Sequence, residues 1–270
     1  MSLYLQHLID TSNHFSVVES AFYGIKWAHQ TAGLKNPCES DIVRSILDAS
    51  KRIRTRPIKK KTPVGPDIIK RLFNMYNKPS RTLKDLRLLS MCALAYTGFL
   101  RYNELCDIKA KNISFTEKYL DIFIEKSKTD CYRKGKNVYI SKLSSSFCPV
   151  KILQSYLTET GIDMDSDMYI FRSLSFLKKS NSFVLRSKNK KLSYTRAREL
   201  IREALSNIGC AEKEFGLHSF RSGGATMAAK YGISDRLFKM HGRWKSDQAK
   251  DGYVSEDLNN RLSVSKNLGI

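Results

Sequence analysis

The chain of 270 residues is 41% hydrophobic, which is enough for one large folded domain or for a large domain joined to a small one. Its 47 Lys and Arg outnumber its 26 Asp and Glu, and the resulting net charge of +21 exceeds what solubility needs and favours a polyanionic partner. Because the basic residues are spread along the chain, nucleic acid is a better candidate than a membrane surface, with a merely basic or ribosome-like protein as the alternative.

Residues 3–50 carry the apolar spacing of helices. Ile42, Val43, Ile46 and Leu47 are one such group, and Ser40 before them is a candidate N-cap. We expect two or three short helices in residues 1–50, forming a small domain whose core would be marginal by itself.

A strongly basic segment, KRIRTRPIKKKTPVGP, occupies residues 51–66. Like charges repel and the prolines oppose helix formation, so we expect an extended linker. Three compatible roles suit it: a solvated tether, a strap along a DNA backbone, and a nuclear-import signal in a eukaryotic host. Its candidate DNA-binding residues are Lys51, Arg52, Arg54, Arg56, Lys59, Lys60 and Lys61.

A second, larger domain is expected over residues 67–270. Helical patterning runs through residues 68–94 and is ended by the Thr97-Gly98 pair. The segment RYNELCDI then begins another helix, which places Arg101 near a helix start and beside a turn.

A β-hairpin is expected next. Residues 119–126 alternate in the manner of a strand, with Leu120, Ile122 and Ile124 on one face, and residues 137–140 form the partner strand. The loop between them, SKTDCYRKGK, is polar and basic. A helix is expected to open at Pro149, and residues 178–191, rich in Lys and Ser, are expected to form a loop.

An amphipathic helix is predicted between Ser193, its N-cap, and Gly209. The opposite face carries Arg196, Arg198 and Arg202, which suit either a solvated surface or contact with a DNA backbone. Further helices are expected over residues 217–230 and from residue 234 onward. The apolar stripe of the first helix consists of Ala197, Leu200, Ile201, Ala204, Leu205 and Ile208.

The six cysteines form no CxxC pair and no ligand-like spacing with the five histidines, so neither a zinc site nor a disulfide framework is expected. Several lie in apolar runs, as Cys92 does, and are interpreted as reduced buried thiols of an intracellular protein. The sequence shows no run of about 18 apolar residues and no signal peptide in its first thirty residues, so we expect a soluble protein. Its location would be nuclear in a eukaryote and cytoplasmic otherwise.

The segment 217–253 contains the residue types that suit chemistry on a phosphodiester, since it includes His218, Arg221 and Tyr253. Cleavage of a phosphodiester needs a nucleophile, cations for the charge on the non-bridging oxygens, and an acid for the leaving hydroxyl. One route uses two metal ions held by carboxylates, but no such carboxylate set stands out. The other route combines a side-chain nucleophile with Arg, His and Lys.

These motifs resemble those of the tyrosine recombinases, the phage integrase family of site-specific DNA recombinases. The matching elements are TGFLRYNEL with Arg101 and Glu104, SKTD with Lys128, HSFR with His218 and Arg221, GRW with Trp244, and GY with Tyr253. The spacings fit the catalytic domain of the family. They are 27 residues from Arg101 to Lys128, 90 from Lys128 to His218, 23 from Arg221 to Trp244, and 9 from Trp244 to Tyr253. The sequence is also similar to recombinases of eukaryotic mobile elements such as cryptons and the DIRS-like group.

The resemblance implies a mainly α-helical protein with a small β-sheet. A tyrosine-recombinase catalytic fold over residues 67–270 would follow a shortened helical core-binding domain at residues 1–50. The implied activity is breakage and rejoining of double-stranded DNA through a 3′-phosphotyrosyl intermediate, by a homotetramer on paired sites, without a metal, a cofactor or a small-molecule substrate. Two alternatives remain open: a catalytically silent DNA-binding protein derived from a recombinase, and a type IB topoisomerase.

Residue roles follow from the resemblance together with the chemistry of each side chain. Arg101 and Arg221 would clamp the scissile phosphate, because a planar guanidinium offers two parallel hydrogen bonds and stays charged. Tyr253 would be the nucleophile and His218 its proton-handling partner. Lys128 would be the acid for the leaving hydroxyl.

Three positions carry alternatives. The hairpin also contains Lys126, Lys134 and Lys136, which are rivals of Lys128 as the acid. Trp244 stands where the family usually has a second His, and it can donate an indole N–H to phosphate but cannot carry a proton; His241 is the rival for that place. Glu104 would orient an active-site cation or form an ordinary surface pair with Arg101.

Overall fold

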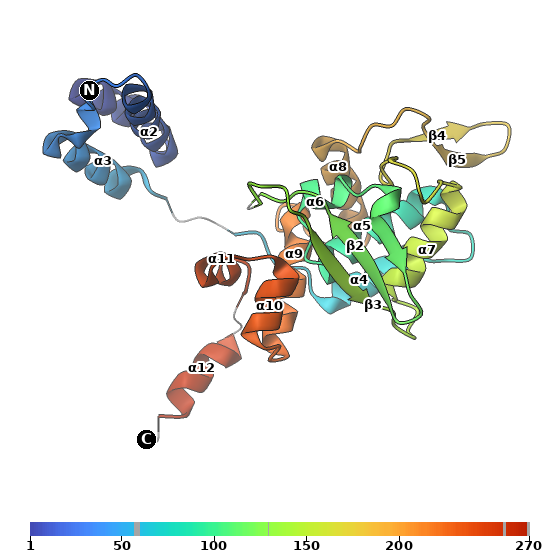
Figure 1. Ribbon diagram of the computed structural model, residues 1–270. Helices are drawn as coiled ribbons and strands as arrows, with labels where there is room; N and C mark the ends of the chain where they lie inside the picture. Colours follow the sequence, from blue (N-terminus) through green and yellow to red (C-terminus); the bar gives the residue numbers. More distant parts are fainter. Residues whose placement is uncertain (57–59, 129, 256–257, 269–270) are drawn as a thin grey trace. The chain divides into compact units, whose positions relative to one another are not determined.

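The computed structural model describes residues 1–56, 60–128, 130–255 and 258–268. The chain divides into two compact units, Met1–Lys60 and Lys61–Ile270. Both are built largely from helices, and the larger one also contains two small antiparallel sheets (Figure 1). The expected fold class, mainly α with a small β-sheet, is therefore confirmed.

The smaller unit is a bundle of three helices, α1 (Ser2–Thr11), α2 (Phe15–Thr31) and α3 (Asp41–Arg54), with the short 3₁₀ helix η1 (Pro37–Glu39) before α3. The three helices pack against one another in every pairing. Their shared core is small, as expected for so short a segment. It consists of Leu5, Ile9, Val18, Phe22, Cys38 and Val43.

The basic linker begins later and is more tightly held than predicted. Helix α3 continues to Arg54, because basic side chains in a last turn interact favourably with the helix dipole. Past residue 60 the chain is extended but attached to the larger unit: Thr62 N–H donates to Glu214 O at 2.8 Å and Val64 N–H donates to Ser219 O at 2.9 Å. Val64 is fully buried, so this end of the segment is part of the fold and not a solvated tether.

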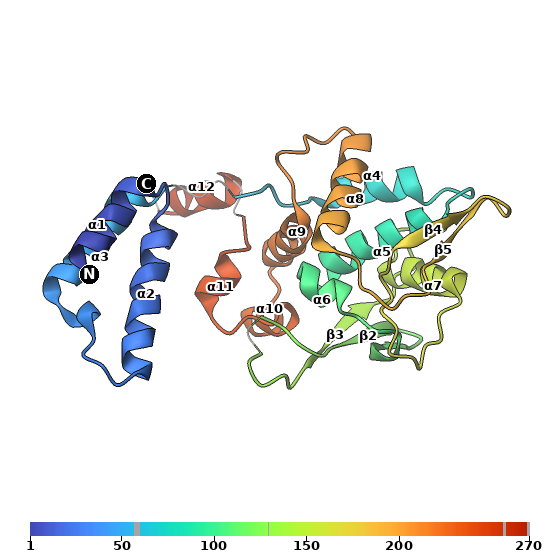
Figure 2. The same ribbon diagram turned by 90° about the horizontal axis from the view of Figure 1, so that it is seen from above.

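Helix α5 forms the centre of the larger unit. Its sequence is apolar nearly all round, and eleven of its 15 residues are buried, which is the pattern of a core helix. It packs against α4, α6, α7, α8 and α9, and Figure 2 shows it between these neighbours. The helices of this unit are α4 (Pro66–Tyr76), α5 (Leu83–Thr97), α6 (Tyr102–Cys106), α7 (Pro149–Thr160), α8 (Tyr194–Asn207), α9 (Leu217–Lys230), α10 (Asp235–Gly242), α11 (Asp247–Asp251) and α12 (Leu258–Lys266), with the 3₁₀ helix η2 (Ala110–Asn112).

The main sheet has three antiparallel strands in the order β1 (Ile113–Phe115), β2 (Tyr119–Ile124) and β3 (Lys136–Ser141). Leu120 pairs with Ile140 and Ile122 with Val138, and these side chains are buried, which confirms the predicted alternation. The β2–β3 loop therefore leaves the sheet at Ile124 and returns at Lys136.

The expectation of a loop over residues 178–191 is wrong in part. A second hairpin forms from β4 (Leu174–Leu177) and β5 (Ser182–Leu185), with Phe176 opposite Phe183. Each strand is only four residues long and the lysines around them gave a loop-like composition, so the alternation was too short to stand out.

The amphipathic pattern of α8 is confirmed, since all six residues of its predicted stripe are buried. Helix α9 has the predicted bounds and lies unusually close to its neighbours. A Cβ atom at Gly223 would collide with the backbone of Val64, and one at Gly224 with the carbonyl oxygen of Tyr96. Gly224 thus permits the close backbone approach that fixes α9 against α5, and Gly223 permits a similar approach to the extended segment before α4.

Within the described residues, no helix has the length and apolar character needed to cross a membrane. All six cysteines are free thiols.

Candidate active site

Arg101 and Glu104 form a buried pair at the start of α6. The chain turns after α5 at Gly98 and Phe99, and Arg101 becomes the N-cap of α6. Glu104 accepts a hydrogen bond from Arg101 N–H at 2.9 Å and from Arg101 Nη1 at 2.7 Å. Because the Glu104 side chain is only 2% exposed, this is not an ordinary surface pair.

Arg243 is a third partner of this cluster, and we did not predict it from the sequence. Its Nη2 lies 2.9 Å from Glu104 Oε2, and it also donates to the carbonyl oxygens of Gly98, Phe99 and His241. Its backbone is left-handed, with φ of 57°, and its side chain is 3% exposed. It lies between two motif residues, but no pattern separates a buried arginine from a surface one.

Electrostatics keep Glu104 ionised. Burial opposes the charge, but Arg243 and the N–H and guanidinium of Arg101 together lower the pKa of Glu104 below its ordinary value. Burial would lower the pKa of Arg101, but the charge of Glu104 and the side chain of Tyr253 raise it overall. Three arginines thus surround one carboxylate, since Arg221 Nη1 lies 3.8 Å from Glu104 Oε2.

Arg221 is fully buried on α9 beneath two aromatic rings. Its Nη2 donates to Gly242 O at 2.7 Å and its Nη1 donates to Phe99 O. Its Cζ lies 4.7 Å from the centroid of Trp244 and 4.7 Å from that of Tyr253. Burial and the nearby charge of Arg101 lower the pKa of Arg221 to about 9, so the guanidinium remains cationic at neutral pH.

The structure places Trp244, not His241, beside Tyr253. The ring centroids of Trp244 and Tyr253 are 5.6 Å apart. His241 instead directs Nε2 to Thr97 O at 2.7 Å and packs edge-on against Phe99. The indole Nε1 of Trp244 is buried and has no hydrogen-bond partner among the described residues.

Arg101, Lys128 and His218 line one pocket of about 660 Å³, which we call the Arg101 pocket. Lys128 comes from the β2–β3 loop and His218 from the first turn of α9, so the pocket unites three of the predicted site residues that lie far apart in the sequence. Thr129, within the SKTD motif, lies outside the described residues. Arg221 does not line this pocket, because Trp244 and Tyr253 cover it.

The rival lysines of the hairpin are placed differently from Lys128. Lys126 also lines the Arg101 pocket but lies 3.8 Å from Asp107, whose other oxygen pairs with Lys191. Lys134 and Lys136 line a separate pocket. Among these four lysines, Lys128 alone both lines the Arg101 pocket and has no carboxylate partner among the described residues.

The surroundings of His218 favour the neutral form of its imidazole. Partial burial lowers its pKa, and the positive charges of Arg221 and Arg101 lower it further, while Glu104 opposes them. The residue is nevertheless exposed to solvent where it lines the Arg101 pocket. At neutral pH the imidazole is therefore free to accept a proton.

The predicted DNA contacts on α8 are partly neutralised. Arg196 pairs with Glu199 at 3.1 Å, and Arg202 pairs with Glu212 at 2.6 Å. Arg198 is exposed and has no carboxylate within ion-pair distance in the described part of the chain.

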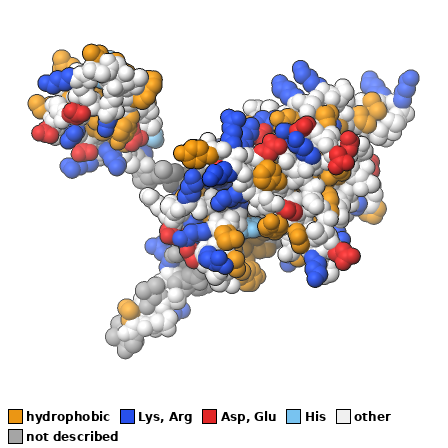
Figure 3. Space-filling model, in the orientation of Figure 1, with side chains coloured by type: hydrophobic (Ala, Val, Ile, Leu, Met, Phe, Trp, Pro, Cys, Tyr) orange, Lys and Arg blue, Asp and Glu red, His pale blue; other side chains and the backbone are white. Residues whose placement is uncertain are grey.

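The predicted DNA-binding residues of the basic segment 51–66 lie in different structural environments. Lys51, Arg52 and Arg54 form the last turn of α3, while Arg56 and Lys60 are exposed. Lys61 Nζ donates to the backbone oxygen of Lys213, and Lys59 lies outside the described residues. Figure 3 shows a wider gathering of Lys and Arg on the larger unit around the β2–β3 loop and α11.

Comparison with known proteins gives consistent matches. The model of the phage integrase family matches residues 64–259. The chain is 24% identical over 226 residues to an integrase/recombinase XerD homolog of Selenomonas ruminantium, covering 83% of this chain and 63% of that protein. It is 25% identical over 243 residues to recombinase Cre of Escherichia phage P1, covering 84% and 66% respectively. The chain thus spans roughly two thirds of the length of these relatives.

Two solved structures share the fold. XerH recombinase bound to a palindromic difH substrate aligns with a TM-score of 0.57 at 16% identity, over 87% of this chain and 58% of that one. The Tn1549 transposon integrase in complex with circular intermediate DNA aligns with a TM-score of 0.59 at 11% identity, over 98% and 83%.

Proposed function

Because this chain belongs to the phage integrase family, whose model matches residues 64–259, we propose that it is a site-specific recombinase that breaks and rejoins double-stranded DNA through a covalent bond to Tyr253. The observation that carries the proposal is the stacking of Tyr253 on Arg221, 4.7 Å from ring centroid to Cζ, within the same cluster as Arg101. A nucleophile beside two guanidinium groups suits attack on a phosphodiester.

Charge balance supports a phosphate as the group bound. Arg101, Arg221 and Arg243 surround Glu104, so the cluster keeps an excess of two positive charges. A phosphodiester carries one negative charge and the pentacoordinate transition state carries two. The cluster therefore stabilises the transition state more than the bound substrate, which is the condition for catalysis.

Binding of DNA has to rearrange the aromatic cover of Arg221. Both terminal nitrogens of Arg221 donate to carbonyl oxygens, and the rings of Trp244 and Tyr253 lie over the guanidinium. The phosphate enters next to Arg101, and Tyr253 shifts off Arg221 toward phosphorus. The unpartnered indole N–H of Trp244 then finds an acceptor in a non-bridging oxygen.

The chemical step follows from these positions. The hydroxyl oxygen of Tyr253 bonds to phosphorus as its proton passes to the neutral His218. The bond from phosphorus to the 5′ oxygen breaks, and Lys128 gives that oxygen a proton. A 5′ hydroxyl from a second duplex reverses both transfers, and the energy of the original bond is held in the tyrosine–phosphate link throughout.

Assembly and DNA binding extend the same proposal. Two duplexes have to be held together for exchange, so the working form would be a tetramer on paired sites. The net charge of +21 supports a DNA partner, and the smaller unit with the basic end of α3 would supply a second arm along the duplex. The XerH and Tn1549 structures named above contain DNA, which supports this partner.

The test is capture of a covalent adduct. Wild-type protein is incubated with a library of duplexes carrying a nick three bases from each candidate site, and protein–DNA adducts are isolated under denaturing conditions and sequenced. We expect adducts at a defined sequence with the wild type and none with Tyr253→Phe, which still binds the same duplexes. Adducts that persist in the Phe variant, or DNA binding without any adduct in the wild type, would contradict the proposal.

A plasmid relaxation assay distinguishes the topoisomerase alternative. A recombinase that needs paired sites leaves a supercoiled plasmid lacking them unchanged. Efficient relaxation of any plasmid by the monomer would favour a type IB topoisomerase.

A further inference from the structure

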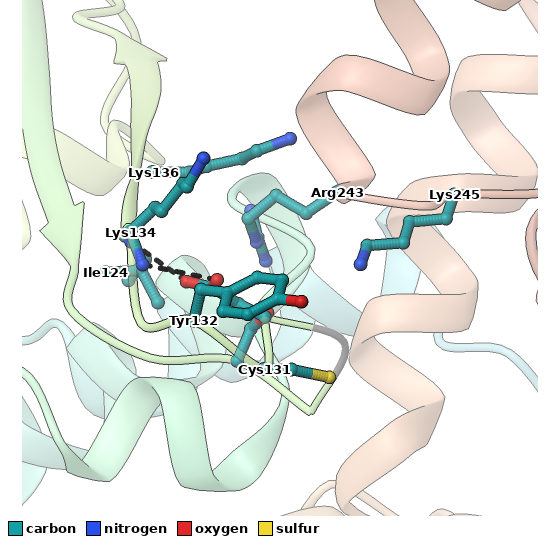
Figure 4. A pocket seen from close by; sticks show the side chains of 10 residues that line it. Ile124, Cys131, Tyr132, Lys134, Lys136, Arg243 and Lys245 are labelled. Atoms are coloured by element: carbon teal, nitrogen blue, oxygen red, sulfur yellow. Dashed lines mark hydrogen bonds between the residues drawn. The ribbon is translucent and has the colours of Figure 1, made fainter.

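A second pocket adjoins the Arg101 pocket at the β2–β3 loop. It has a volume of about 270 Å³ and is lined by Lys134 and Lys136 from the hairpin and by Arg243 and Lys245 from the connection between α10 and α11. Figure 4 shows Arg243 and Lys245 extending from one side toward the hairpin that carries the two other lysines. We call it the Lys245 pocket.

The loop that bears Lys128 is the wall between the two pockets. Ser127 and Asp130, the residues on either side of the segment 128–129, line both of them. A ligand seated in the Lys245 pocket would therefore press on the same few residues that place Lys128 beside Arg101.

The three lysines of the Lys245 pocket have no ion-pair partner among the described residues. In the described part of the chain, no carboxylate lies within ion-pair distance of the amino groups of Lys134, Lys136 or Lys245. By contrast, the neighbouring Lys239 and Lys250 both pair with Asp235 and Asp247. The fold thus supplies carboxylates to the lysines on either side of Lys245 in sequence but not to Lys245 itself.

The acidic residue of the pocket compensates for only part of this charge. Asp130 accepts hydrogen bonds from Gly135 N–H at 2.9 Å and from Lys134 N–H at 3.2 Å, so its oxygens serve the loop backbone. Arg243 is already paired with Glu104, so the three lysines and Asp130 leave the lining an excess of two positive charges.

A buried donor also lacks an acceptor. Arg243 lines the pocket, is 5% exposed, and has an Nε–H without a hydrogen-bond partner in the part of the chain described here. A buried N–H without a partner is costly.

We propose that the Lys245 pocket binds a second phosphate of the DNA, a neighbour of the scissile phosphate, and that this contact holds the β2–β3 loop with Lys128 in place for catalysis. The inference rests on the proposed function, because it takes DNA as the ligand. A phosphate fits the chemistry: it presents several acceptor oxygens to convergent lysines and carries the negative charge that the lining lacks. The protein would then bind two phosphates of the duplex: the scissile phosphate, and a neighbouring phosphate whose binding holds the β2–β3 loop in place.

The experiment measures coupling between Lys245 and individual phosphates. Duplexes carrying a single uncharged methylphosphonate at each position around the cleavage site are bound to wild type, to Lys245→Gln and to the control Lys142→Gln, an exposed lysine of the same hairpin outside both pockets. Affinity is measured by titration at several salt concentrations, and adduct formation is measured separately.

We expect Lys245→Gln to weaken binding roughly fivefold and to reduce the salt slope by about one. One methylphosphonate should weaken the wild type by the same factor and cause no further loss in Lys245→Gln, while the losses add for Lys142→Gln at every position. On that substrate adduct formation should fall more than affinity, because Lys128 is no longer held. Lys136→Gln should reproduce the coupling at the same phosphate.

Additive losses for Lys245→Gln at every position would overturn the proposal. The affinity measurements do not require cleavage. A wild type that binds DNA but forms no adduct would therefore refute the proposed function, while the affinities would still test whether the Lys245 pocket binds a phosphate. Thermal unfolding of each variant verifies that the fold is retained.

Discussion

Replacing Glu104 with Gln tests the charged cluster at the centre of the site. Glu104 accepts from Arg101 N–H, from Arg101 Nη1 and from Arg243 Nη2, all within 2.9 Å, and it is 3% exposed. The amide keeps the shape but loses the charge, and its NH₂ group would face a guanidinium. Each charge-assisted hydrogen bond contributes about 1.5–3 kcal/mol, and removing one partner of a buried ion pair costs about 3–5 kcal/mol. We expect Glu104→Gln to lower the unfolding free energy of the larger unit by about 3–5 kcal/mol at pH 7.

The assay follows Trp244 fluorescence during urea unfolding. The chain has two tryptophans, so Trp27, which is 68% exposed in the smaller unit, is replaced by Phe to leave Trp244 as reporter of the larger unit. The matched control is Glu203→Gln, which removes an exposed pair with Lys84 at 3.5 Å and should cost less than about 1 kcal/mol.

The pH dependence supplies an independent check on the same variant. The folded-state pKa of Glu104 is lowered, so its stabilising contribution is complete above the unfolded pKa of about 4.3 and is lost as pH falls through the folded value. The stability difference between parent and Glu104→Gln should therefore be constant from pH 7 to about 5 and shrink below about 4.3. A difference below about 1 kcal/mol at pH 7, or one that is unchanged in acid, would refute the reasoning.

Three further outcomes are expected. Gly224→Ala should lower the unfolding free energy measured in urea by about 1–3 kcal/mol, because the added Cβ meets a backbone oxygen. The control Gly24→Ala, with open space around it, should be neutral or slightly stabilising. Equal effects of the two substitutions would argue against close packing of α9. The single-turnover rate of adduct formation should fall in acid with a midpoint below 6.5, because His218 must be neutral and its pKa is lowered; an acid limb unchanged in His218→Gln would assign it to another group. Lys128→Ala should slow adduct formation by about 10²–10⁴-fold on ordinary DNA but only slightly on DNA with sulfur at the leaving 5′ position, because a thiolate leaves without an acid. The control Lys126→Ala should have a mild effect on both substrates. Equal slowing of Lys128→Ala on the two substrates would rule out the acid role.

Much of the fold was readable from periodic signals. Helix α8 was predicted with its buried stripe because six apolar residues recur at helical spacing between a Ser cap and Gly209. The β2–β3 hairpin was equally clear, since Leu120, Ile122 and Ile124 recur at every second position. Where the signal was short, as in the four-residue strands β4 and β5, composition suggested a loop and the prediction failed.

The site was predictable as a set of residues but not as an arrangement. Ordered motifs indicated Arg101, Arg221 and Tyr253 because their chemistry is specific. The sequence contains no information about which basic side chain is buried, so the ionic contacts of Arg243 and the complete burial of Arg221 emerged only when distant segments were brought together. Trp244 and His241 were likewise separable only by their contacts, since both lie near Tyr253 in the chain.

The bond between Glu104 and Arg243 has a consequence for how such a chain changes over time. Each residue is buried, each carries a charge that the other offsets, and they come from segments 139 positions apart. The two residues are not equally dependent: Glu104 keeps Arg101 if Arg243 changes, whereas loss of Glu104 leaves the buried charge of Arg243 with carbonyl oxygens alone. In an alignment of descendants, a chain that has lost the acid at position 104 should therefore also have lost the basic residue at position 243, while the reverse need not hold.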